Sequence, residues 1–337
     1  MKNNGLSCSL RRLLSAVASL AAGLSAGFVL MGFIAWKQQG SLAAGLSAAF
    51  HGGLLPLLTA GWKNGVDSLL SSAAAVMLLG LSVSFAWQGG LWQLGGPGFF
   101  GLGALGAFFG FSLGLPWYVC FVFACAAGAL GGVIPGLIKS KGRMHEGYAT
   151  ALMNWLCLWS VQAIGKSSPF PEIGPLPPRW LGWGGALALC LLLMVFLKCT
   201  LPGFEIHLLG RDASVARWAG VKEGKKALLI LTVSGMLAGA AGGWQLISGQ
   251  LTALPGPAFA LTGLGLHGLA AAALALGHPA LTCAAALLVT LLSGGAGALD
   301  QNLFPPETGE GIIALILFFA SILRVSSHFT REGRDKA

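Results

Sequence analysis

Charged side chains are scarce in this sequence. Asp, Glu, Lys and Arg together make up 9% of the 337 residues, and only 11 residues are acidic. Soluble domains carry roughly 25% charged residues, so this scarcity excludes a soluble globular protein. The chain is instead 55% hydrophobic, contains 52 glycines, and has several apolar runs long enough to cross a bilayer. These features predict an all-α fold, a polytopic bundle of transmembrane helices.

Motifs for binding metals, cofactors or nucleic acid are also missing. The seven cysteines form no Cys-x-x-Cys motif and no His-rich ligand pair, so we predict no metal site. Two Gly-x-Gly-x-x-Gly runs, at 101–106 and 263–268, lack the β-strand and acidic residue of a dinucleotide site, so no cofactor is expected. The net charge of +9 arises in loops at helix ends rather than on one patch, which argues against a nucleic-acid partner.

Titratable side chains are rare inside the apolar runs. No spacing of Ser, His, Asp or Glu there supports a catalytic set, so we do not expect an enzyme. An ion-coupled carrier would need ionisable groups near mid-membrane, despite an insertion cost of about 2.5–3.5 kcal/mol each. Glu146, Lys198 and Arg324 lie at helix ends, and a lone deeper residue such as His267 is more often a packing residue than a proton relay. Energy for transport is therefore expected from a separate ATPase.

The apolar runs predict ten spans, although nine or eleven stay open because two boundaries are indistinct. With the N-terminus inside, ten crossings place 16 of the 20 Lys and Arg residues in the cytoplasm and 4 outside (Lys37, Lys63, Lys166 and Arg179). We therefore predict one transmembrane domain over 1–337, with a cytoplasmic loop 203–225, a cytoplasmic tail 326–337 and both termini inside. The predicted spans are 13–36, 66–87, 97–114, 116–138, 147–165, 183–202, 226–247, 260–276, 279–296 and 309–325.

Glycines at four-residue spacing mark two spans as central packing helices, because helices in lipid approach closely only where residues are small. These glycines are Gly128, Gly132 and Gly136 in the fourth span, and Gly235, Gly239 and Gly243 in the seventh.

Two stretches rich in glycine and proline resemble each other. Residues 86–110 and 244–268 each contain Trp-Gln-Leu, then Pro-Gly, then Gly-x-Gly-x-x-Gly. They predict an inverted five-plus-five repeat, and broken helices at matched positions indicate a substrate path. Their aromatic and neutral polar side chains suit a neutral, ring-containing solute better than a zwitterion, unless the Trp residues are interfacial anchors. The candidate path residues are Trp87, Gln88, Trp92, Gln93, Phe99, Trp244, Gln245 and His267.

One polar interruption, residues 204–226, holds eight charged side chains. Small residues recur in it at Gly210, Ala213, Ala216, Ala219 and Gly220, so a short helix here would offer a flat face to another protein. We interpret it as a docking element, with an ordinary cytoplasmic loop as the alternative.

Four segments resemble the permease family of bacterial ABC importers for nucleosides, ribose-type sugars and branched-chain amino acids, most closely its nucleoside branch, which works with a basic-membrane-lipoprotein binding protein. They read WQGGLWQLGGPGFFGLGALGA (87–107), GGVIPGLIKSKGRMHEGYATALMNW (131–155), EIHLLGRDASVARWAGV (205–221) and GLHGLAAAALALGHP (265–279).

The resemblance implies a permease in the bacterial cytoplasmic membrane, paired with a second permease, usually as a heterodimer. It also implies cytoplasmic ABC ATPase subunits and an external substrate-binding lipoprotein. Glu146 and Asn154 match a Glu and an Asn of the family, which adds Asn154 to the candidate path. Residues 92–99 depart from the nucleoside branch by losing an acid and an amide, which leaves the substrate open. The loop resembles the coupling loop that sits on the ATPase, and its candidate contacts are Glu205, Gly210, Arg211, Asp212, Ala216, Ala219 and Gly220.

These observations favour an importer for a nucleoside or similar heterocycle, riboflavin included. A sugar or amino-acid importer, an ion-coupled secondary carrier and a structural membrane subunit are the alternatives.

Overall fold

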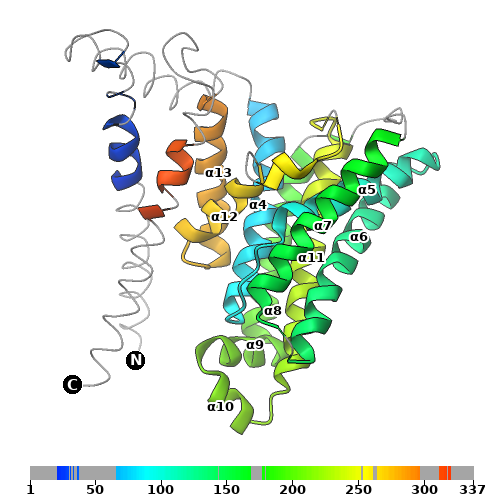
Figure 1. The fold of residues 1–337 in the computed structure, drawn as a ribbon, viewed down its shortest axis with the longest axis vertical. Coiled ribbons are helices and arrows are strands. Elements are labelled where there is room, and N and C mark those ends of the chain that lie inside the picture. Colours follow the sequence, from blue (N-terminus) through cyan, green and yellow to red (C-terminus); the bar gives the residue numbers. More distant parts are fainter. Residues whose placement is uncertain are drawn as a thin grey trace. The chain divides into compact units, whose positions relative to one another are not determined.

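The computed structural model describes residues 21–29, 31, 33, 36–37, 66–142, 144–167, 177–178, 180–251, 253–260, 264–296, 311–316 and 318–319. Within these residues the secondary structure is helical, without strands (Figure 1). The helices are α4 (Val66–Gln88), α5 (Gly96–Ser112), α6 (Trp117–Ser140), α7 (Glu146–Ser167), α8 (Trp180–Cys199), α9 (Leu201–Arg211), α10 (Ala213–Trp218), α11 (Glu223–Ile247), the 3₁₀ helix η2 (Pro257–Ala260), α12 (Leu264–Leu274) and α13 (Pro279–Ala296).

Eight of the ten predicted spans coincide with helices, namely α4–α8 and α11–α13, and their bounds agree within four residues. Four of these helices, α4, α6, α8 and α11, are long and apolar enough to cross a membrane, and α5, α12 and α13 contain shorter apolar helices. α12 and α13 are separate, because Leu276 and Gly277 adopt positive φ angles of 50° and 74° that end α12. The predicted spans 13–36 and 309–325 lie only partly within the described residues, and the tail 326–337 lies outside them.

The described chain falls into two compact units. The larger contains Leu70–Ala272 and Gly277–Leu287, and the smaller contains Met1–Leu69, Ala273–Leu276 and Leu288–Ala337. In the smaller unit, residues 21–29 and 311–316 are helical and pack together, since a Cβ added to Gly27 would lie 3.0 Å from the Ile312 side chain. One domain over 1–337 stays a prediction.

Glycines bring α6 and α11 into direct backbone contact. A Cβ added to Gly128 would lie 2.6 Å from the Cα atom of Gly239, and one added to Gly235 would lie 3.0 Å from the Cα atom of Gly132. α5 joins them at Gly103, whose added Cβ would overlap the Gly239 backbone, and the three helices lie side by side in Figure 1. The predicted central packing of the two glycine-bearing spans is confirmed, because only glycine allows this approach.

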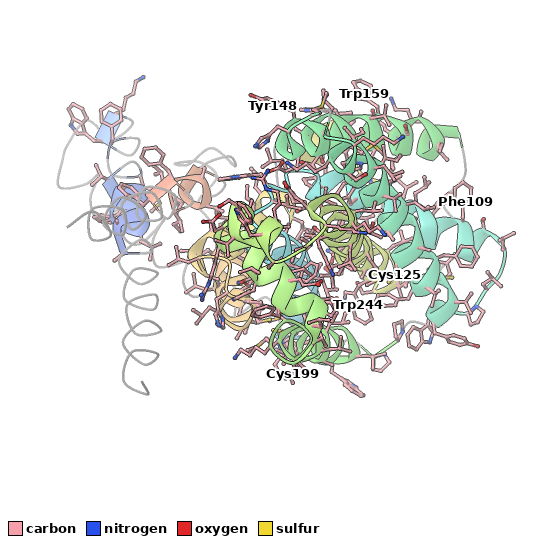
Figure 2. The ribbon with its side chains drawn as sticks, turned by 90° about the horizontal axis from the view of Figure 1, so that it is seen from below. Phe109, Cys125, Tyr148, Trp159, Cys199 and Trp244 are labelled. Atoms are coloured by element: carbon pink, nitrogen blue, oxygen red, sulfur yellow. The ribbon has the colours of Figure 1, made fainter. Side chains whose placement is uncertain are left out.

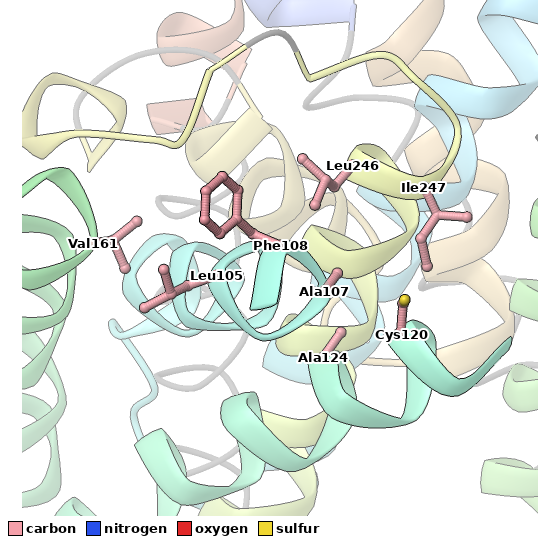
Figure 3. Close-up of a cluster of buried hydrophobic side chains, with 8 residues drawn as sticks. All are labelled: Leu105, Ala107, Phe108, Cys120, Ala124, Val161, Leu246 and Ile247. Carbon is pink, nitrogen blue, oxygen red and sulfur yellow. The ribbon is translucent and has the colours of Figure 1, made fainter. Parts of the chain in front are cut away.

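A hydrophobic cluster fills the space where α5, α6, α7 and α11 meet (Figure 3). Buried hydroxyl pairs then tie α4 to its neighbours: the Ser82 hydroxyl donates to the Ser234 carbonyl at 2.8 Å, and the hydroxyls of Ser84 and Thr282 lie 2.7 Å apart. Such pairs satisfy polar groups where lipid offers no partner. The cluster consists of Leu105, Ala107, Phe108, Cys120, Ala124, Val161, Leu246 and Ile247.

Candidate functional site

Two helices that follow broken segments begin side by side inside the larger unit. The first break, 89–95, leads into α5, and the second break, whose described residues are 248–251 and 253–260, precedes α12. A Cβ added to Gly265 would lie 2.6 Å from the Cγ atom of Pro97, so the first turns of α5 and α12 are in contact. Leu79 of α4 lies against the start of both helices.

The two helices run in opposite directions from this meeting point. α12 is parallel to α4, α5 is antiparallel to α6, and both α4 and α6 are antiparallel to α11. This is the arrangement that an inverted repeat predicts. The pairs that give the directions are Leu79–Gly268 and Trp87–Gly277 for α4 with α12, Cys120–Gly110 and Phe123–Gly106 for α6 with α5, Ala124–Gly239 and Leu231–Gly132 for α6 with α11, and Ser82–Ser234 and Ile230–Gly89 for α4 with α11.

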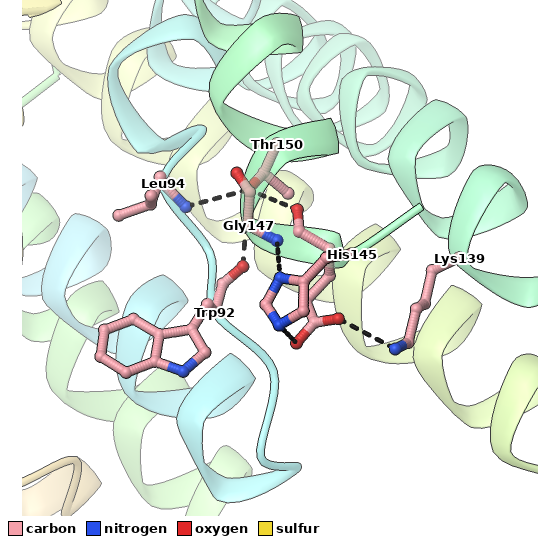
Figure 4. A network of polar contacts seen from close by, with 7 residues as sticks. Trp92, Leu94, Lys139, His145, Gly147 and Thr150 are labelled. Atoms are coloured by element: carbon pink, nitrogen blue, oxygen red, sulfur yellow. Dashed lines mark hydrogen bonds and ion pairs between the residues drawn. The ribbon is translucent and has the colours of Figure 1, made fainter. Parts of the chain in front are cut away.

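The first break is held by the N-terminal half of α7. The Thr150 hydroxyl accepts a hydrogen bond from the Leu94 N–H at 3.2 Å and donates within its own helix to the Glu146 carbonyl at 2.9 Å, with the Trp92 carbonyl 3.4 Å away (Figure 4). One turn further along α7, the Asn154 Oδ1 atom accepts from the Gly98 N–H at 2.6 Å. That N–H is one of the groups that a helix start leaves unbonded, so Asn154 stabilises the beginning of α5.

The second break lies against the C-terminal half of α7 and the start of α5. A Cβ added to Gly256 would lie 2.8 Å from the Gln162 amide nitrogen, and one added to Gly165 would lie 3.1 Å from Leu254. The rings of Phe100 and Phe259 stack with centroids 4.9 Å apart. α7 therefore supports both breaks.

Four candidate path residues are buried. Gln93 belongs to the first break, Phe99 and Asn154 lie at and beside the first turns of α5, and His267 is in the first turn of α12. None of the four side chains is a carboxylate, an amine or a guanidinium. Neither polar atom of the Gln93 amide has a hydrogen-bond partner among the described residues.

The other candidates lie at the ends of α4 and α11 and in the first break. Trp92 is exposed and makes an edge contact with Trp87, with ring centroids 6.1 Å apart, and the Gln88 amide donates to the Gly277 carbonyl at 2.6 Å. Trp244, which is labelled in Figure 2, and Gln245 occupy the last turn of α11, and a Cβ added to Gly182 of α8 would overlap the Trp244 ring. The structure thus separates the Trp-Gln pairs of the two breaks.

Buried charge is confined to one ion pair among the described residues. The buried Glu146 carboxylate lies 2.9 Å from the Lys139 amine and 3.6 Å from the His145 ring. Burial raises the pKa of Glu146, but the hydrogen bond from Lys139, the helix backbone and the neighbouring charges outweigh it, so this pKa lies below its usual value. No three His, Cys, Asp or Glu side chains of the described residues gather into a metal site.

The predicted docking element forms two short helices at the end of the larger unit (Figure 1). Asp212 ends α9 and caps α10, because its carboxylate accepts from the Ser214 and Val215 N–H groups at 2.7 and 3.3 Å. Hydrogen bonds from the Ser214 side chain and backbone lower the pKa of Asp212. An ion pair between Glu205 and Lys226 joins α9 to α11.

The small residues of this element do not share one exposed face. Ala216 is fully buried, and a Cβ added to Gly210 would lie 3.0 Å from the Gly90 backbone nitrogen in the first break. Ala216 therefore packs inward, and Gly210, although exposed like Ala219 and Gly220, contacts the backbone of the first break on one side. The exposed surface of this element also carries large apolar side chains, among them Trp218, which is 92% exposed. Small size at Gly210 thus serves contact within the chain.

Thr150 was not foreseen from the sequence. It is a buried hydroxyl in α7, four residues after Glu146. The available signal was its distance of four residues from Asn154, which places both side chains on one face of α7.

The family described as the branched-chain amino acid transport system permease component matches residues 65–321. The guanosine ABC transporter permease protein NupP of Bacillus subtilis is 29% identical over 343 residues, which cover 93% of this chain and 94% of that protein. The nucleoside permease NupB of Lactococcus lactis is 24% identical, covering 78% of this chain and 80% of its own.

The glucose ABC transporter permease protein TsgB13 of Haloferax volcanii is 26% identical, covering 80% of this chain and 81% of its own. A metal-chelate type ABC transporter solved in an inward-facing conformation matches with a TM-score of 0.40 at 17% identity, over 95% of this chain and 98% of the other.

Proposed function

We propose that this chain, which belongs to the family of branched-chain amino acid transport system permease components, carries a nucleoside across the bacterial cytoplasmic membrane as the permease subunit of an ABC importer. Family membership makes it a membrane-embedded, multi-pass ABC permease. Its sequence similarity to a guanosine permease and a nucleoside permease favours a nucleoside as the substrate. The path would run through the meeting point of α5 and α12.

The observation that carries the choice of substrate is the neutral character of that meeting point. Gln93, Asn154 and His267 supply buried hydrogen-bonding groups in the first break, on α7 and in the first turn of α12, and no buried carboxylate or amine of the described residues is free of a partner. An amino-acid zwitterion would leave its own charges unpaired, at a high cost in free energy. A nucleoside is neutral, and its base can stack and form amide hydrogen bonds.

A simple sugar is the second candidate, because the glucose permease of Haloferax volcanii is a relative over most of this chain. A sugar is also neutral, so the absence of buried charge does not separate the two. The nucleobase is the difference between them, since a sugar has no aromatic face that can stack on an aromatic side chain.

The energy would come from cytoplasmic ABC ATPase subunits that bind α9 and α10. The exposed Trp218 and Val215 give this element an apolar surface that a partner protein would cover, and Arg211 and Asp212 beside it are also exposed. This assignment places α9 and α10 in the cytoplasm, which agrees with the excess of Lys and Arg in cytoplasmic loops. A second permease and an external binding lipoprotein would complete the importer.

Uptake into cells that carry the complete importer tests this proposal. Labelled guanosine should accumulate in the presence of ATP, resist collapse of the ion gradients, and be displaced by other nucleosides more strongly than by glucose or leucine. Stronger displacement by glucose would support the sugar, and stronger displacement by leucine would contradict the neutral path. Loss of uptake with the ion gradients, at constant ATP, would contradict an ABC importer.

A further inference from the structure

The side chains of residues 91–94, which follow the turn at Gly89 and Gly90 in the first break, alternate between the inside and the outside of the larger unit. Leu91 and Gln93 are 5% and 1% exposed, whereas Trp92 and Leu94 are 51% and 42% exposed. Alternate side chains of an extended chain point to opposite sides. Gln93 therefore points inward, three residues before the first turn of α5.

The amide of Gln93 is buried. Its nitrogen and its oxygen both lack hydrogen bonds to the described residues, so exchanging the two atoms would not change this result. A carboxamide has two N–H donors and two lone pairs on its oxygen. Buried side-chain polar atoms are usually bonded in folded proteins, and an exception requires an explanation.

Hydrogen bonds to α7 hold the backbone on both sides of Gln93, so the position of its amide is set by the fold. Thr150 bonds the Leu94 N–H and lies 3.4 Å from the Trp92 carbonyl, so the residues on both sides of Gln93 are attached to α7 (Figure 4). Asn154 holds the following helix start through the Gly98 N–H. A side chain on such a support keeps its position, as a group that selects a ligand must.

We propose that Gln93 selects the substrate by pairing its amide with an adjacent donor and acceptor on a nucleobase, such as the N1–H and O6 groups of guanine. This inference rests on the proposed function and goes further, because it assigns base recognition to one side chain. The pairing has the geometry by which glutamine reads base edges in DNA, where two hydrogen bonds discriminate between bases. Sugar hydroxyls rotate and offer no fixed pair of this kind.

The test uses the complete importer in proteoliposomes with ATP and compares guanosine with 1-methylguanosine, in which a methyl group replaces the N1–H donor. The wild type should prefer guanosine by about 5- to 150-fold in kcat/KM, the range for one such pair. Gln93→Met keeps the length of the side chain and removes both polar atoms. It should reduce the preference to about two-fold, mainly by raising the KM for guanosine.

Controls separate recognition from folding. Gln162→Met, the same change on α7, should keep the preference. Gln93→Met should assemble and unfold at the same or a higher temperature, because it removes unbonded polar atoms from the interior. Failure of this variant to assemble would mean that the protein itself bonds the amide, and would overturn the proposal.

The outcomes distinguish the two proposals. A wild type that does not transport guanosine contradicts the proposed function. A wild type that transports guanosine but does not distinguish it from 1-methylguanosine, or a Gln93→Met variant that keeps the distinction, contradicts only the role of Gln93.

Discussion

Replacing Gly210 with alanine should uncouple ATP hydrolysis from transport. Gly210 is in the last turn of α9, and its α-carbon faces the backbone of Gln88 and Gly90, where α4 ends and the first break begins. This is a direct contact between the proposed ATPase-docking element and the proposed substrate path. A movement of α9 would reach the break through it.

The structure gives the size of the perturbation. A Cβ on residue 210 would lie 2.9 Å from the carbonyl carbon of Gln88 and 3.0 Å from the nitrogen of Gly90. Both are backbone atoms that cannot rotate away, and overpacking of this kind costs about 1–3 kcal/mol. Alanine also favours the helix over glycine by about 1 kcal/mol, so α9 should persist while its contact with the break opens. Subtracting this gain leaves a net loss of about 0–2 kcal/mol, and the upper half of that range corresponds to a factor of roughly 5–30.

The assay measures nucleoside uptake and ATP hydrolysis by the reconstituted importer. Gly210→Ala should assemble with its ATPase and hydrolyse ATP, but uptake per ATP should fall by about 5- to 30-fold. Gly185→Ala on α8 is the matched control, because no atom lies within 4 Å of its added Cβ. Uptake per ATP within two-fold of wild type in Gly210→Ala, or an equal loss in the control, would refute the role of this contact.

Three further predictions concern packing, pH and orientation. Gly128→Leu should separate α6 from α11 and cost more than about 3 kcal/mol, seen as loss of folded protein in detergent, and a normal yield would contradict the glycine contact. Lys139→Gln should destabilise the protein by about 1–3 kcal/mol at pH 7, because it leaves the buried Glu146 carboxylate without its ion-pair partner. Folding lowers the pKa of Glu146, so this stabilisation is present above the unfolded pKa of about 4.3. It disappears as the pH falls through the folded pKa. The thermal unfolding temperatures of variant and wild type should therefore converge in acid. In a cysteine-free background, Ser112→Cys should react with an impermeant thiol reagent added outside cells and Ser214→Cys should not, and the reverse pattern would invert the topology.

The spans and their closest contacts could be predicted because each depends on a local feature. Apolar runs of membrane-crossing length fixed the helix bounds within four residues, and glycines at four-residue spacing identified α6 and α11. The breaks were visible as well, since glycine and proline interrupt helices wherever they cluster.

The orientation of the docking element could not be predicted. Small residues suit both an exposed docking face and a tight internal contact, so composition does not say which way Gly210 and Ala216 point. The answer depends on Gly90, which is 120 residues away in the chain and becomes a neighbour only after folding. The same limit applies to Thr150, whose partner is the backbone of a distant segment rather than a side chain with its own pattern.

The separation of the two Trp-Gln pairs follows from the inverted arrangement itself. Trp92-Gln93 precedes α5 and Trp244-Gln245 precedes the second break, and the helices that follow the two breaks run in opposite directions from one meeting point. Motifs that precede the starts of α5 and α12 must then lie on opposite sides of that point. Similarity between the copies therefore indicates where the proposed path lies, but it does not imply that both pairs belong to one site.

α7 connects the two sides of that path. Thr150 holds the first break and Gly165 contacts the second, 15 residues apart, which is about 22 Å along one helix. Between them, Leu158 packs on Gly101 of α5, where an added Cβ would lie 3.3 Å away. A rigid tilt of α7 about this contact would move one break toward the path and the other away from it, which is the reciprocal motion that alternating access requires. Spin labels on the two ends of α7 should then report opposite distance changes to α6 when ATP is added, and changes of the same sign would contradict the pivot.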